Sequence, residues 1–330
     1  MSKRWPLKLG LAALSAALAF VVLGEVALRV WRPMAVRMFD EKVQGSPGER
    51  VVRIDESLEV HPKHGIFQVD PVLGFRPVLG GEKYAPHGAH WNDYPAEKPP
   101  DKRRLLFIGD SVTDRGKLVT ALSERLGDGY EYWNGGVVGY TTTQELAYYR
   151  DYLAGIRADH VILTFHLNDY EVTPVVFEMD GEYVQVHSRI GNTYPNPWLL
   201  KNSYLYRFGW SWMASREGQA KLDDSIDAEV TAGLRALRDL VHARGADFTV
   251  IVLPWLVERA KWPAEKVRHH ELTLRTLEEL GVRHYAFLDT LDRAIAAGME
   301  IHETKVDPQH PSLEFARAMA DDLLARGFRP

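Results

Sequence analysis

Short apolar segments and helical segments alternate through the last two thirds of the chain. Five segments have the composition of buried strands: LLFIG at 105–109, EYWN at 131–134, DHVILTF at 159–165, DFTVIVLP at 247–254 and VRHYAFLD at 282–289. Segments with helical spacing occupy 117–127, 143–156, 226–245, 264–281 and 311–327, with Thr143 as the expected N-cap of the second. Continuous apolar strands between helices predict a parallel sheet covered on both faces, a three-layer α/β/α sandwich of the doubly wound type.

The first residues of the chain carry a separate signal. Lys3, Arg4 and Lys8 precede an apolar segment at 9–30. It is roughly 20 residues long, which is enough to cross a bilayer as a helix. A cleaved signal peptide has a shorter apolar region and a small-residue cleavage site, so a retained signal anchor over residues 1–35 is favoured. We expect the rest of the chain to be exported and held at the membrane.

Charge and cysteine content exclude several classes of protein. The net charge is -5 and the body of the chain has no basic stripe, so nucleic acid is not an expected partner. With no cysteine, the chain has no disulfide, cysteine nucleophile or thiolate metal site. His61 and His64, or His269 and His270, have no carboxylate cluster at recognisable spacing, so we expect exposed side chains and no metal site.

Two regions lie outside the alternating pattern. Residues 36–103 contain many prolines, glycines and polar turns, and we expect an N-terminal extension to the main domain at 104–330. Residues 171–225 form an insertion that is long for a connection and rich in tyrosine and tryptophan. Such a segment is either a lid or binding loop, or a surface excursion with a small satellite core; the sequence favours neither.

Polar residues follow four of the predicted strands. They are Gly109-Asp110-Ser111 after the first strand, 134–142 after the second, His166-Leu167-Asn168-Asp169 after the third, and Asp307-Pro308-Gln309-His310-Pro311 beyond the fifth. Reactive sites of doubly wound sheets lie at the carboxyl ends of the strands. We therefore expect these four segments to meet at one edge of the sheet.

The residue types in these segments suit acyl transfer. A serine hydroxyl such as that of Ser111 becomes a nucleophile when a neighbouring base takes its proton, and His310 is the candidate base. Asp307 is close enough in sequence to orient the imidazole. Gly139, Asn168 and the Ser111 N–H are candidate donors to an oxyanion, because a glycine backbone N–H permits close approach and an asparagine amide supplies a side-chain donor.

Each segment also has an ordinary structural explanation. Ser111 suits a helix N-cap, and Asn134-Gly135 is a common turn dipeptide. Asn168 with Asp169 suits a capped turn, and His310 lies in a proline-stiffened loop before a helix. The order and placement of the four segments together are more specific than any one of them.

Taken together, the four segments resemble the signature blocks of the SGNH/GDSL hydrolases. The matching residues are Gly109-Asp110-Ser111; Asn134, Gly136 and Gly139; Asn168-Asp169; and Asp307, His310 and Pro311. The resemblance covers residues 104–326. It implies a five-stranded, flavodoxin-like sheet, no metal or organic cofactor, and a triad of Ser111, His310 and Asp307 with Gly139 and Asn168 in the oxyanion hole. His166 stands where the family usually has glycine, and we expect a structural histidine at the strand end, with contact to substrate as the alternative.

The resemblance implies a serine esterase. The Gly-x-Ser-x-Gly elbow of the α/β-hydrolases is absent around Ser111, which argues against that fold. An anchored, exported domain suggests esters of the cell envelope as substrates, such as O-acetylated glycans or lipid esters. The alternatives are an envelope polysaccharide O-acyltransferase that uses the same residues and a non-catalytic glycan-binding module.

Overall fold

The computed structural model describes residues 5–37, 51–54, 66–70, 72–173, 175–179, 182–186, 189–191, 193–305 and 307–330. The chain divides into two compact units. The anchor unit comprises Met1–Glu56 and Pro174–Ser225, and the sheet unit comprises Ser57–Thr173 and Ile226–Pro330. All four segments with candidate site residues belong to the sheet unit.

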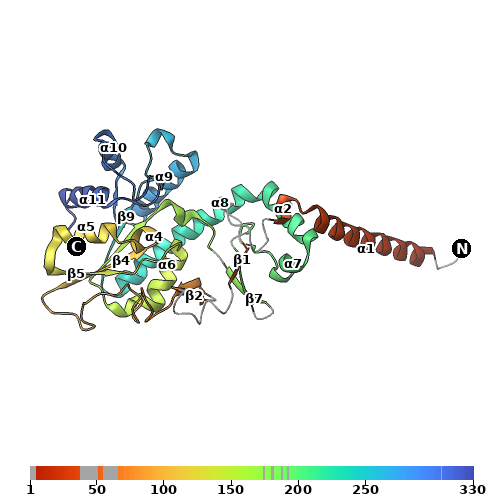
Figure 1. Cartoon of the computed structure of the whole chain (residues 1–330), viewed down its shortest axis with the longest axis horizontal. Helices are drawn as coiled ribbons and strands as arrows, with labels where there is room; N and C mark the ends of the chain where they lie inside the picture. Colours follow the sequence, from red (N-terminus) through yellow and green to blue (C-terminus); the bar gives the residue numbers. More distant parts are fainter. Residues whose placement is uncertain are drawn as a thin grey trace. The chain divides into compact units, whose positions relative to one another are not determined.

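The sheet unit is built on five parallel strands (Figure 1). Their bounds are β4 Arg103–Gly109, β5 Tyr130–Asn134, β6 His160–Phe165, β9 Asp247–Val252 and β10 Arg283–Ala286. The spatial order is β10-β9-β6-β4-β5, so the second strand along the chain lies outside the first and the others follow on the opposite side. This is the flavodoxin-like order, and the predicted fold class is confirmed.

Burial explains why these segments form a parallel sheet. All six residues of β6 are buried, as are all residues of β4 except the first. Helices pack in pairs around the sheet: α5 (Lys117–Leu126) contacts α11 (Leu313–Ala325), and α6 (Thr142–Tyr148) contacts α8 (Tyr204–Ala243). The remaining helices of this unit are α4 Ser111–Asp114, α9 Ala264–Glu279 and α10 Leu288–Ala296.

Two predictions about helices are wrong, and one helix was not predicted. Helix α6 begins after Thr141, not Thr143, because the Thr141 N–H donates to the Gln144 side chain (3.1 Å). The third predicted helix begins far before 226, at Tyr204, where residues distant in sequence satisfy its first N–H groups. Helix α10 was not predicted, because the apolar segment at 282–289 suggested a longer strand than β10.

Part of the predicted extension belongs to the sheet unit. It contains an antiparallel hairpin of β2 (Phe67–Asp70) and β3 (Gly74–Pro77), followed by irregular chain as far as β4. The Tyr140 hydroxyl donates to Phe75 O (2.8 Å), and the Gln144 amide donates to Leu73 O (2.5 Å). The hairpin is therefore fixed to the loop and helix that follow β5.

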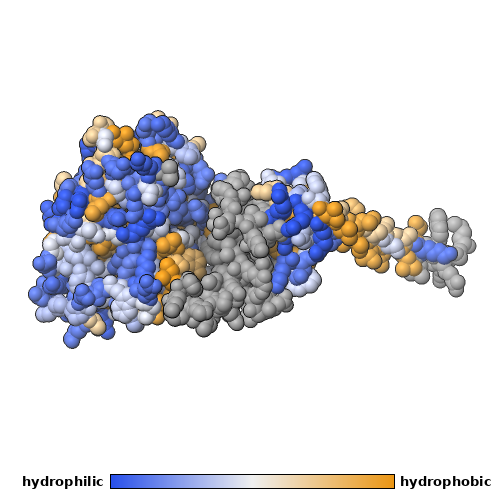
Figure 2. Space-filling model, in the orientation of Figure 1, coloured by the Kyte–Doolittle hydropathy of each residue, from blue (hydrophilic) through white to orange (hydrophobic). Residues whose placement is uncertain are grey.

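The anchor unit combines a long apolar helix with a small sheet. Its elements are α1 Trp5–Trp31, α2 Met34–Arg37, β1 Val51–Ile54, β7 Val175–Met179, β8 Glu182–Val186, α7 Pro197–Asn202 and the first part of α8, with the antiparallel order β1-β8-β7. Residues Lys8–Trp31 of α1 form one helix long and apolar enough to cross a membrane. Figure 2 shows the apolar side chains exposed along this helix.

Candidate active site

Ser111 lies at a sharp turn between strand and helix. Strand β4 ends at Gly109, and Ser111 is the first residue of α4. The Asp110 carboxylate accepts a hydrogen bond from the Val112 N–H (2.9 Å), which caps this short helix. The Ser111 N–H lies in the first turn, where backbone donors have no intrahelical partner, so it is available to an oxygen held above the serine.

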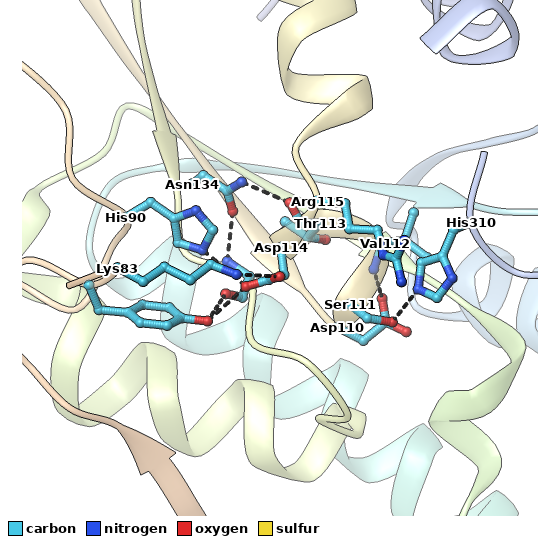
Figure 3. Close-up of polar contacts among 12 residues, drawn as sticks. Lys83, His90, Asp110, Ser111, Val112, Thr113, Asp114, Arg115, Asn134 and His310 are labelled. Carbon is cyan, nitrogen blue, oxygen red and sulfur yellow. Dashed lines mark hydrogen bonds and ion pairs between the residues drawn. The ribbon is translucent and has the colours of Figure 1, made fainter. Parts of the chain in front are cut away.

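His310 brings the C-terminal part of the chain to this serine. Its Nε2 lies 2.8 Å from the Ser111 hydroxyl, and its Nδ1 lies 2.5 Å from Asp307 Oδ2 (Figure 3 shows Ser111 and His310). Ser111 and His310 are each 9% exposed, so both are largely shielded yet reachable from solvent. Three residues predicted to act together are thus in one hydrogen-bonded chain.

Backbone donors hold Asp307 in its charged form. Burial alone would raise the pKa of this carboxyl, but hydrogen bonds from the Gln309 N–H (2.9 Å) and from His310 lower the pKa below its usual value. The loop is also fixed from outside, since the Leu256 N–H donates to Pro308 O (2.8 Å). An ionised, fixed carboxylate keeps a proton on His310 Nδ1 and leaves Nε2 to accept from Ser111.

The two other candidate oxyanion donors lie in loops after β5 and β6. Gly139 has a φ of 76°, a conformation that favours glycine. Its loop runs beside the end of β4, because the Val137 N–H donates to Gly109 O (3.0 Å). The Asn168 amide donates to Asp110 Oδ2 (2.7 Å), which places Asn168 next to the residue before the serine.

Gly136 and Asn134 have a structural role at this edge. A Cβ on Gly136 would lie 2.3 Å from Asp114 N, so only glycine permits this approach to α4. The Asn134 side chain donates to Thr113 O (2.8 Å) and accepts from the Gly136 N–H (2.9 Å). The loop after β5 is thereby held against the helix that carries Ser111.

A polar cluster around Asp114 was not predicted from the sequence. Its carboxylate accepts from Lys83 Nζ (2.6 Å) and the Tyr84 hydroxyl (2.8 Å), and His90 Nε2 lies 3.2 Å away. Burial would raise the pKa of Asp114, but these three partners hold the pKa below its usual value. In Figure 3 this cluster lies on one side of α4 and His310 on the other, so it fixes the helix from behind.

Two further carboxyl groups are buried near Asp110. Asp169 accepts from the Thr142 hydroxyl (2.9 Å) and the His166 N–H (3.0 Å), yet burial, and then the charge of Asp110, raises its pKa well above the usual value. Burial likewise raises the pKa of Glu145, with Asp169 and Asp110 adding to the effect. Both groups favour the neutral form, which reduces the negative charge that a developing oxyanion would meet.

The prediction that His269 and His270 are exposed is wrong. His269 and His270 are buried: the His269 ring stacks on Tyr170 at 4.1 Å, and the His270 ring packs edge-on against Trp262 at 5.6 Å. Aromatic packing on α9, which the sequence spacing does not reveal, accounts for their burial. His61 and His64 lie outside the described residues. Among the residues that are described, no group of three or more His, Cys, Asp or Glu side chains is placed to bind a metal ion.

Comparison with known proteins matched solved structures at low sequence identity. No protein-family model matches this chain, and no curated protein matches it. A catalytic mutant of an acetylxylan esterase from Geobacillus stearothermophilus aligns over 71% of this chain and 98% of its own, with 15% identity and a TM-score of 0.46. An alpha/beta hydrolase enzyme from the metagenome of Lake Arreo, Spain, aligns over 68% and 94%, with 17% identity and a TM-score of 0.45. A further acetyl xylan esterase aligns over 68% and 100%, with 13% identity and a TM-score of 0.45.

Proposed function

We propose that this protein is a serine ester hydrolase of the SGNH/GDSL type. The observation that carries the proposal is the continuous hydrogen-bonded chain from the Ser111 hydroxyl through His310 to Asp307. Capping of α4 is performed by Asp110 and does not require Ser111, and a stiff loop would require only the prolines around His310. Neither explanation requires the imidazole to point at the serine with a carboxylate behind it.

The proposed reaction has two acyl-transfer steps. His310 takes the proton of Ser111 as the hydroxyl oxygen attacks an ester carbonyl, and the Ser111 N–H, Gly139 and Asn168 stabilise the oxyanion. His310 then gives the proton to the leaving alcohol, which leaves an acyl group on Ser111. In the second step His310 takes a proton from water as the water oxygen attacks the acyl-enzyme, and it then gives that proton to the Ser111 oxygen as the bond to the acyl group breaks and the acid is released.

The proposal is tested by ester hydrolysis with the full-length protein in detergent. We expect turnover of p-nitrophenyl acetate, and we expect a fluorophosphonate probe to label Ser111 and to stop that turnover. Parallel assays with a long-chain p-nitrophenyl ester distinguish short acyl groups from lipid-like ones. Labelling of Ser111 without hydrolysis would favour the O-acyltransferase that requires a sugar acceptor. Neither labelling nor hydrolysis by the folded protein would contradict a catalytic serine and favour a glycan-binding module.

Asp307→Asn is expected to lower kcat about 10²- to 10⁴-fold, because an amide in place of the carboxylate disfavours the required histidine tautomer and the imidazolium. The measurement is kcat and KM for p-nitrophenyl acetate. Asp321→Asn is the matched control, since Asp321 pairs with Arg125 on the surface and is expected to leave kcat unchanged. Equal activity of Asp307→Asn and wild type would assign the orientation of His310 to another group.

We further propose that α1 is a retained membrane anchor and that the sheet unit lies outside the cytoplasm, with envelope glycan or lipid esters as substrates. The support for retention is Glu25, whose carboxylate accepts from the Tyr204 and Leu205 N–H groups and from the Ser203 hydroxyl (2.9, 2.9 and 3.0 Å). It caps α8 and also pairs with Arg29 (2.9 Å). A signal peptide removed after export would take this cap away from the mature protein.

Retention makes a measurable prediction. We expect the full-length protein to keep its N-terminus, to remain in the membrane fraction after alkaline carbonate extraction, and to be degraded by protease added to intact spheroplasts. A cytoplasmic protein without a signal sequence, followed in the same spheroplasts, serves as the control for protection from protease. A shortened N-terminus in the mature protein would show that α1 is a cleaved signal, and protection from protease would place the sheet unit inside the cell.

A further inference from the structure

His166 occupies the position between the end of β6 and Asn168. Its side chain is fully buried. The ring stacks on the Trp255 indole, with centroids 6.0 Å apart. The Lys266 ammonium lies 5.4 Å from the centroid of the same indole. The backbone N–H of His166 donates to Asp169 (3.0 Å). The ring is therefore held in one orientation, with Nδ1 2.9 Å from Asn168 Oδ1.

The direction of the hydrogen bonds around Asn168 follows from Asp110. Both Asp110 carboxyl oxygens accept a hydrogen bond: Oδ1 from the Val112 N–H and Oδ2 from Asn168 (2.7 Å). The group of Asn168 that faces Asp110 must be the NH₂. Its carbonyl oxygen then faces His166, and because that oxygen only accepts, His166 Nδ1 must carry the proton.

The opposite orientation of the amide is unfavourable at both ends. A flipped Asn168 would put its carbonyl oxygen 2.7 Å from the Asp110 carboxylate, with no hydrogen between two acceptors. The backbone N–H of Asn168 also points toward His166 Nδ1, but at 3.4 Å this contact is longer than the one to Oδ1. Burial lowers the pKa of His166, so the ring favours the neutral form, with one proton to place. That proton belongs on Nδ1.

We propose that His166 is a positioning residue for the oxyanion hole, which fixes the Asn168 amide through its Nδ1–H so that one N–H bonds Asp110 and the other is directed to the oxyanion. This inference rests on the proposed esterase function. His166 does not touch the reacting atoms. Its effect is to prevent the flip of the Asn168 amide and the rotation of the Asn168 side chain, so that the N–H donor stays in one position. Donors held in position before the reaction are the ones that stabilise a transition state.

The test compares His166→Asn with His166→Leu in the full-length protein. Asparagine places an N–H where His166 has Nδ1, whereas leucine places a methyl group there with little change of shape. We expect His166→Leu to lower kcat for p-nitrophenyl acetate about 10- to 100-fold with KM little changed, and His166→Asn to restore most of the loss. His160→Leu is the matched control: it removes a buried histidine at the start of β6, whose Nε2 contacts Thr249 (2.8 Å), and is expected to leave kcat unchanged.

A double-mutant cycle separates positioning from loss of structure. In an Asn168→Ala background, His166→Leu is expected to have no further effect on kcat, because the group that His166 positions is gone. Thermal unfolding of each variant identifies those that are folded. This inference alone would be overturned if folded His166→Leu had the kcat of the wild type. It would also be overturned if His166→Leu lowered kcat by the same factor in the Asn168→Ala background as in the wild type. Absence of hydrolysis and of Ser111 labelling in the wild type would overturn the esterase function and this inference with it.

Discussion

Ser111→Ala is expected to abolish hydrolysis of p-nitrophenyl acetate by the full-length protein, with kcat about 10⁴- to 10⁶-fold below wild type. The hydroxyl oxygen forms the acyl bond, and no other group in the hydrogen-bonded chain with His310 replaces it. The remaining donors would still bind an oxyanion, so a trace of activity above that of water is expected. The measurement is steady-state turnover, with thermal unfolding to confirm that the variant is folded.

Ser123→Ala is the matched control for this variant. Ser123 lies on the surface of α5, where its hydroxyl donates to Thr120 O (2.8 Å), and its loss is expected to leave kcat unchanged. Fluorophosphonate labelling should disappear in Ser111→Ala and persist in Ser123→Ala. Undiminished turnover or labelling in Ser111→Ala would place the nucleophile elsewhere and contradict the proposed mechanism.

Arg104→Leu is expected to lower the free energy of unfolding by about 3–5 kcal/mol, because it breaks a buried ion pair and leaves one charge without its partner. Arg104 is 2% exposed, and its Nε donates to Glu131 (2.6 Å). The same guanidinium donates to Ile156 O (2.6 Å) and Pro95 O (3.0 Å) and lies over the Trp133 ring. It thus connects β4 with β5, with the chain before β6 and with the segment that precedes the sheet.

Arg103→Leu provides the control one residue away. Arg103 points outward and pairs with Asp247 in an exposed ion pair, which is worth at most about 1 kcal/mol. Urea-induced unfolding of both variants, followed by tryptophan fluorescence in the same detergent, gives the comparison. A double replacement, Arg104→Met with Glu131→Leu, should regain much of the loss, since no unpaired charge remains. Equal losses for Arg103→Leu and Arg104→Leu would show that burial of the pair is not the cause.

The strands of the sheet could be predicted from the sequence because their signals are local, whereas the flavodoxin-like order was implied by the resemblance to the SGNH/GDSL hydrolases. Each strand is a short apolar segment, and a buried strand such as β6 needs no polar alternation. The same holds for Asp307 and His310, whose spacing in one loop allows them to meet. The carboxyl ends of parallel strands then brought Ser111 to the same edge.

The features that were not predicted depend on partners distant in sequence. Helix α8 begins at Tyr204 because Glu25, from the first helix, caps it. Asp114 contacts Lys83, Tyr84 and His90. These three residues lie in a segment for which the local sequence pattern predicts only turns. The position of the proton on His166, which follows β6, depends on Asp110, which follows β4, because Asn168 is hydrogen-bonded to both. No propensity or periodicity contains this information.

Ser111 and His310 are separated by 199 residues, and α11 comes after the base along the chain. Ribosomes and translocation channels deliver a chain from its N-terminus, so the serine emerges long before the imidazole exists. Until α11 packs beside α5, the hydroxyl has no base and is chemically ordinary. Under the proposed topology, the nascent chain therefore passes the cytoplasm without hydrolytic activity, and the timing of synthesis protects cytoplasmic esters without a separate inhibitor.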